Sequence, residues 1–72
     1  MKVTGTIERQ EIGVGTWALL SETGEVFELM DAPPEILQPG LKCSVEGTIR
    51  DDVMTMAAIG PVLEVNAFEL LS

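Results

Sequence analysis

The sequence predicts an all-β domain, a small five- or six-stranded antiparallel Greek-key barrel with one short helical turn after the third strand. The chain has 72 residues and no break in composition, so we expect one domain, residues 1–72. Apolar and polar residues alternate through most of the chain, which is the period of a β-strand. Segment 31–40 is the exception, because its prolines leave room for only about one helical turn.

The clearest predicted strand is Leu41–Arg50, in which apolar and polar residues alternate strictly. Successive strand residues point to opposite faces, so one face is predicted to be core and the other wet. The predicted core face holds Leu41, Cys43, Val45, Gly47 and Ile49.

A first strand, Lys2 to about Gln10, carries a similar pattern, since residues 3–7 match residues 45–49 at four of five positions. Both segments place a glycine on the apolar face, Gly5 and Gly47, where another backbone can come close.

A hairpin is predicted where Thr16–Leu20 and Val26–Met30 flank the polar connection Ser21–Glu25. Two period-2 pairs are expected to face the core: Trp17 and Leu19, and Phe27 and Leu29. Trp17 could instead be an exposed stacking platform, but its spacing favours the core. In the helical turn, Ile36 and Leu37 are expected to plug one end of the barrel.

The acidic turn Asp51-Asp52 leads into a predicted strand, Val53–Ile59, in which both faces carry apolar residues. Periodicity does not settle which face points inward. The last predicted strand is Val62–Leu71, with Leu63 and Val65 in one phase and Phe68 and Leu70 in the other. The slip at Asn66-Ala67 predicts a β-bulge.

This order of strands and helical turn is that of the OB-fold. Segments 15–19 and 24–29, the Pro39-Gly40 entry and Val45-Glu46-Gly47 resemble the pattern of small, uncharacterised bacterial OB-fold-like domains. The resemblance covers nearly the whole chain and implies an OB-like barrel. The chain departs from nucleic-acid-binding OB families, because it lacks their surface aromatic clusters and basic face.

Charge and composition limit the function. Twelve acidic residues against four basic ones give a formal charge of −8, which repels a phosphate backbone, so nucleic acid is an unlikely partner. The chain has no His, no Tyr and one Cys, and therefore cannot form a Ser-His-Asp or Cys-His arrangement. We predict that it is not an enzyme and holds no cofactor or metal, although Asp51-Asp52 could hold a weak divalent-cation site.

Other features predict location and the state of the cysteine. The chain has no long apolar span, and no apolar region follows Met1. We therefore expect a cytoplasmic domain with no signal peptide and no membrane anchor. Cys43 is predicted to be a buried small hydrophobe. Gly13-Val14-Gly15 lacks the third glycine of a dinucleotide site and the Lys-Ser/Thr of a P-loop, so it is predicted to be a turn.

Besides the weak cation site at Asp51-Asp52, two functions remain for such a domain. The first is a non-catalytic module that binds a protein partner or a second copy, or serves a structural role. Its predicted interface consists of Val53, Met54, Met56 and Ile59, whose apolar excess needs a cover and favours a homodimer or a hetero-partner.

The second function is binding of a small ligand, an oligosaccharide or a single-stranded nucleic acid at the rim of the OB face. The predicted rim residues are Glu11, Gly13, Gly15, Thr16, Arg50, Asp51 and Asp52.

Overall fold

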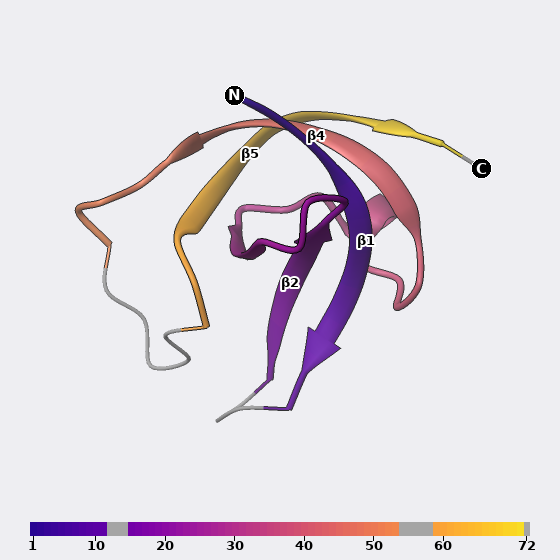
Figure 1. Ribbon diagram of the computed structural model, residues 1–72, viewed down its shortest axis with the longest axis horizontal. Coiled ribbons are helices and arrows are strands. Elements are labelled where there is room, and N and C mark those ends of the chain that lie inside the picture. Colours follow the sequence, from indigo (N-terminus) through magenta and orange to yellow (C-terminus); the bar gives the residue numbers. More distant parts are fainter. Residues whose placement is uncertain (12–14, 54–58, 72) are drawn as a thin grey trace.

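The computed structural model describes residues 1–11, 15–53 and 59–71. These residues form a closed barrel of five strands in the order β1-β2-β3-β5-β4, and β4 pairs with β1 to complete it (Figure 1). The elements are β1 (Lys2–Gln10), β2 (Thr16–Ser21), β3 (Val26–Met30), the 3-10 turn η1 (Pro34–Ile36), β4 (Lys42–Ile49) and β5 (Val62–Leu70). The predicted all-β barrel with one short turn after the third strand is therefore confirmed.

Neighbouring strands are antiparallel with one exception. β1 pairs antiparallel with β2 and β4, β2 with β3, and β4 with β5, whereas β3 and β5 pair in parallel through Glu28–Met30 and Val62–Glu64. The expectation of a purely antiparallel sheet is wrong at this pair. Alternation in a sequence shows which face a residue takes, but it does not show which strand lies beside it or in which direction.

The residues that alternation predicts to be core do lie in or against the hydrophobic core of the barrel. Val3, Ile7, Leu19, Phe27, Val45 and Val65 are buried, and Trp17, Leu29 and Ile49 are half-buried and pack against them. Cys43 is buried as predicted, and Leu63 completes the cluster. In β4 one polar position differs from expectation: Ser44, on the predicted wet face, is only 4% exposed. It is short, lies between β1 and β5, and its hydroxyl is 3.2 Å from that of Thr4.

The single turn η1 closes one end of the barrel. Pro33 and Pro34 suit its start, because a first turn does not use their missing N–H groups. Ile36 is fully buried and forms the predicted plug, whereas Leu37 is only half-buried. Gly40 then takes φ 86°, which favours glycine, before β4 begins.

Two glycines allow β1 and β4 to bend. Gly5 pairs with both Ser21 and Cys43, at the point where β1 passes from β4 to β2. A Cβ there would collide with the Leu20 carbonyl oxygen, and one at Gly47 would collide with that of Glu64. The predicted close approach of another backbone is confirmed at both positions.

β5 contains the predicted bulge. Glu46 of β4 lies opposite Ala67 and Gly47 lies opposite Val65, so Asn66 has no residue opposite it. Because of this extra residue, Leu63 and Val65 face the core before the bulge and Phe68 and Leu70 take the inner face after it. A strand whose apolar phase slips in the sequence therefore keeps one apolar face in the structure.

The predicted strand Val53–Ile59 cannot be compared with the structure over most of its length, since residues 54–58 lie outside the described residues. Its ends, Val53 and Ile59, are half-buried and belong to no strand. Among the described residues, no helix is long and apolar enough to cross a membrane.

Candidate functional site

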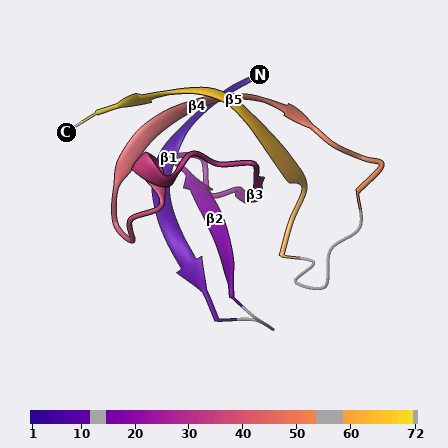
Figure 2. The same ribbon diagram turned by 180° about the vertical axis from the view of Figure 1, so that it is seen from behind.

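The second half of β5 is paired along one edge only. Val62–Glu64 lie between β3 and β4, whereas the rest of the strand continues past the end of β3 with β4 as its partner. Figures 1 and 2 show the C-terminal end of β5 projecting beyond the other strands in both views. Residues 66–71 therefore present a backbone edge that no described strand pairs with. We call this the open edge of β5.

The direction of the backbone groups on this edge follows from one hydrogen bond. The Leu71 N–H donates to the Lys42 carbonyl oxygen of β4 at 3.2 Å. Successive residues of a strand direct their N–H and C=O groups to opposite edges. The N–H and C=O groups of Phe68 and Leu70 therefore point away from β4, along the open edge.

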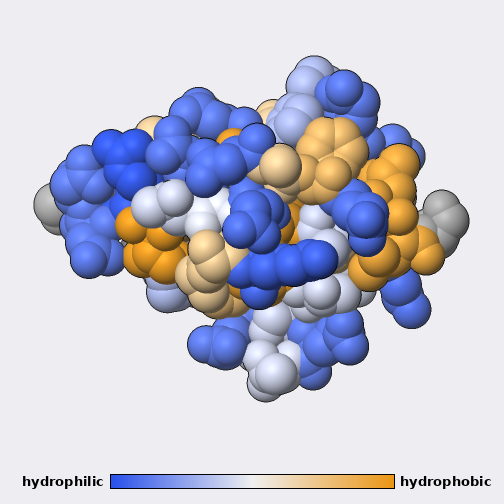
Figure 3. Space-filling view, turned by 90° about the horizontal axis from the view of Figure 1, so that it is seen from above, coloured by the Kyte–Doolittle hydropathy of each residue, from blue (hydrophilic) through white to orange (hydrophobic). Residues whose placement is uncertain are grey.

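The side chains beside the open edge are apolar and accessible. Leu70 is 50% exposed and Leu71 is 48% exposed, and Phe68 is half-buried against the core. Phe68 and Leu70 lie on the inner face of the strand, opposite Val45 and Cys43. In Figure 3, hydrophobic side chains gather on the side of the molecule where the C-terminal end of β5 lies.

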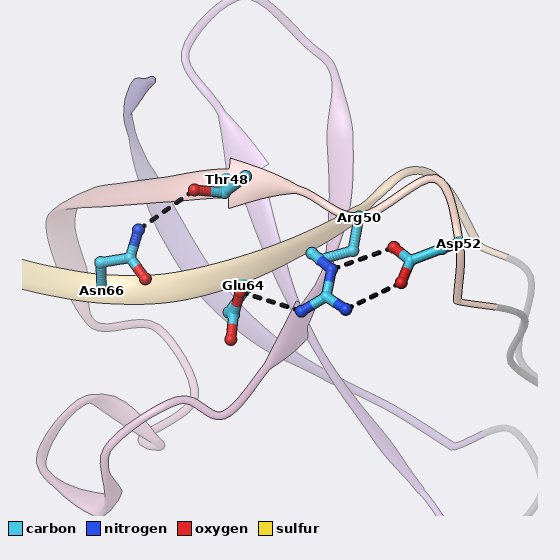
Figure 4. A network of polar contacts seen from close by, with 5 residues as sticks. All are labelled: Thr48, Arg50, Asp52, Glu64 and Asn66. Carbon is cyan, nitrogen blue, oxygen red and sulfur yellow. Dashed lines mark hydrogen bonds and ion pairs between the residues drawn. The ribbon is translucent and has the colours of Figure 1, made fainter.

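Two of the predicted rim residues after β4, Arg50 and Asp52, form an ion-pair cluster with Glu64 of β5 (Figure 4). The Arg50 guanidinium donates through Nε and Nη2 to the two carboxylate oxygens of Asp52, at 3.0 and 2.8 Å, and through Nη1 to Glu64 Oε1 at 3.1 Å. Beside this cluster, Asn66 Nδ2 donates to Thr48 Oγ1 at 3.2 Å. These contacts fasten the turn after β4 to the first half of β5.

The cluster also sets the charge states of its members. The hydrogen bonds from Arg50, followed by a backbone hydrogen bond, lower the pKa of the Asp52 carboxyl to about 2. The hydrogen bonds to Asp52 and Glu64 raise the pKa of Arg50 in turn. Because both carboxylates already occupy its guanidinium, Arg50 is poorly placed to bind an external anion.

Two of the predicted rim residues, Glu11 and Gly15, lie beside Arg9, which in turn lies over the ring of Trp17. Arg9 lies 5.5 Å from the centroid of the Trp17 ring, a cation–π distance, and its Nε is 3.9 Å from the Glu11 carboxylate. Gly15 takes φ 97°, and a Cβ there would collide with the Arg9 guanidinium. Trp17 is thus half-buried beneath Arg9, rather than a free stacking platform.

The predicted rim residues fall into two groups, one around the β1–β2 connection and one directly after β4. Glu11, Asp51 and Asp52 are exposed, Thr16 begins β2, and Gly13 lies outside the described residues. Across residues 1–11, 15–53 and 59–71, no hydrogen bond or ion pair joins Glu11–Thr16 to Arg50–Asp52. Binding at this rim stays a prediction.

Reactive groups are few on the described part of the chain. Burial raises the pKa of the Cys43 thiol, which favours the protonated form over the nucleophilic thiolate. Within the described ranges no group of three His, Cys, Asp or Glu side chains could hold a metal ion.

Sequence reasoning missed the open edge, although one signal was present. Leu70 and Leu71 are adjacent, so the two faces of β5 are both apolar at its end. A strand with one wet face does not show this pattern. The predicted strand Val53–Ile59 shows the same two-sided apolar pattern in the sequence.

Comparisons of the chain with models of protein families, with curated proteins and with solved structures found no match.

Proposed function

We propose that the chain is a non-catalytic β-barrel module that binds another protein through the open edge of β5. The observation that carries the proposal is the combination of unpaired backbone groups at Phe68 and Leu70 with the exposed side chains of Leu70 and Leu71.

An unpaired strand edge is a template for a further strand. An extended segment of a partner gains main-chain hydrogen bonds along such an edge, and pockets or apolar side chains on alternate positions give it specificity. The open edge is short, from residue 66 to residue 71, so the contact buries little area and belongs with weak, transient interactions. Among the described parts of the barrel, this is where both the backbone and apolar side chains are available to a partner.

The predicted interface of Val53, Met54, Met56 and Ile59 lies largely outside the described residues and stays a prediction. The alternative function of binding a ligand or a single strand of nucleic acid at the rim also stays a prediction. Neither explains the exposed leucines of β5. Of the predicted rim residues, Arg50 is engaged by two carboxylates of its own chain.

A selection experiment tests the proposal without requiring a known partner. A phage-displayed library of random peptides is selected on the immobilised chain, and the enriched peptides are titrated into ¹⁵N-labelled protein. We expect the largest chemical-shift changes at the amides of Phe68 and Leu70.

Two variants at one position separate strand addition from contact with a side chain. Leu70→Pro removes an N–H that no described strand uses, whereas Leu70→Ala shortens the side chain and keeps the N–H. Binding that survives Leu70→Ala with modest loss but is abolished by Leu70→Pro supports the proposal. Enriched peptides that bind both variants as well as the parent, or that shift amides of the rim instead, would place the site elsewhere. Thermal unfolding of each variant confirms that the barrel is intact.

A further inference from the structure

We infer that the segment bound at the open edge of β5 is an extended one in which a basic residue lies between two apolar residues. This inference rests on the proposed function and names the chemistry of the partner.

The basic residue follows from Glu69. This exposed carboxylate lies between Phe68 and Leu70 and points to the outer face of β5, opposite Ser44 of β4. On the described part of the chain no cation lies within 4.0 Å of it, in contrast with Glu64, which Arg50 engages. A strand added at the open edge would place one side chain directly beside Glu69, and opposite charges at such cross-strand positions attract.

The two apolar residues follow from the other face of the strand. Phe68 and Leu70 continue a layer that begins with the buried Val45 and Cys43 of β4. In an added strand, the residues on either side of the basic one point to this inner face. Apolar side chains at those positions would cover Phe68 and Leu70 and extend the layer by one strand.

The charge of the whole molecule favours such a segment over a second copy of the chain. Each copy carries a formal charge of −8, so two copies repel each other, whereas a basic segment is attracted. In an antiparallel pair of two β5 strands, Glu69 would also lie opposite its own copy or opposite an uncharged residue such as Ala67 or Leu71. No such register supplies a cation.

The test uses two blocked, fluorescein-labelled nine-residue peptides, one alternating Val and Lys and the other alternating Val and Glu, measured by fluorescence anisotropy. We expect the Val/Lys peptide to bind at least about tenfold more tightly in low salt, and the difference to shrink as salt screens the charges. Glu69→Lys changes the sign of the charge at the edge but leaves the chain acidic, so it should reduce the preference for the Val/Lys peptide without reversing it. Equal binding of the two peptides, or an unchanged preference in Glu69→Lys, overturns the inference.

Two controls separate strand addition from diffuse attraction to an acidic protein. Versions of the Val/Lys peptide are N-methylated on either the odd or the even backbone amides. Only the version whose methyl groups face β5 should lose binding, since the other retains every hydrogen bond to the edge. Equal effects of the two methylation patterns, or full binding to Leu70→Pro, would mean that net charge alone attracts the peptide and would overturn the inference.

The proposed function and this inference fail in different ways. If peptides bind the edge whatever their charge, and their binding requires the Leu70 N–H, the proposed function is supported and the inference is overturned. Sedimentation equilibrium adds a further outcome. A dimer of the parent chain that Leu70→Pro dissociates would identify a second copy as the occupant, and it would also overturn the inference.

Discussion

The two halves of β5 have the same partner strand and the same apolar pattern, yet they differ in burial and in charge pairing. Leu63 is fully buried and Leu70 is 50% exposed, although both lie on the inner face of β5, opposite residues of β4. Glu64 pairs with Arg50, whereas Glu69 has no ion-pair partner within the described residues. The first half has β3 on its second edge and the second half has no described strand there. Two inner-face leucines of one strand thus differ in burial where the strand has β3 on its second edge and where it does not.

The largest expected effect contrasts the two halves directly. Leu63→Ala leaves a cavity in the barrel and should lower the free energy of unfolding by about 2–5 kcal/mol. Leu70→Ala removes a half-exposed side chain and should lower it by no more than about 0.5 kcal/mol. Urea unfolding followed by Trp17 fluorescence measures both. Similar losses in the two variants would show that the end of β5 is covered as well as its start.

A smaller effect is expected where the two halves meet. Gly47 lies opposite Val65, next to the bulge, and a Cβ there would collide with the Glu64 carbonyl oxygen. Gly47→Ala should therefore cost about 1–3 kcal/mol of stability through a forced backbone shift. Glu46→Ala, at the preceding and exposed position, is the matched control, with an expected change within about 0.5 kcal/mol. An equally small change in both variants would mean that the strands separate there at little cost.

These contrasts also show how far the sequence could be interpreted. Alternation of apolar and polar residues predicts most of the core, the bulge at Asn66 and the close approaches at Gly5 and Gly47. Each of these features depends on which face a residue takes, and the sequence shows that directly. The parallel pairing of β3 with β5 and the open edge depend on which strand lies beside which, and no local pattern encodes this. Ser44 is buried despite its polar phase, because its side chain is short and its hydroxyl lies 3.2 Å from that of Thr4 on the neighbouring strand.

The candidate site was harder to predict than the fold. The rim residues were predicted from the loops that an OB-like strand order places at one end of a barrel. In the structure, Arg50 pairs with Asp52 and Arg9 pairs with Glu11, so each arginine contacts a residue close to it in the sequence. Exposure of Leu70 and Leu71 is a property of the sheet edge, and it became visible only when the pairing of β5 was known.

The smallest expected effect concerns the ion pairs that only the first half of β5 makes. The folded-state pKa of Asp52 is about 2, below its ordinary value of 3.8. Because it is lowered, the contribution of this group to stability is fully present above about pH 4 and is lost as the pH falls through about 2. Arg50→Gln should raise the pKa of Asp52 toward its ordinary value. A ¹³C NMR titration of the Asp52 carboxyl measures the shift, and an unchanged midpoint in the variant would assign the low pKa to the backbone hydrogen bond instead.

The bulge at Asn66 gives β5 an uneven tolerance to the loss of a residue. In a regular strand, deleting any one residue turns every following side chain to the opposite face. At the bulge two residues, Asn66 and Ala67, occupy the space opposite one, so the loss of either leaves Val65, Phe68 and Leu70 on the inner face. A deletion scan across Val62–Leu70 should therefore find folded protein at these two positions and unfolded protein at Leu63 or Glu64. The extra residue makes β5 a place where the length of the chain can change by one without inverting the strand.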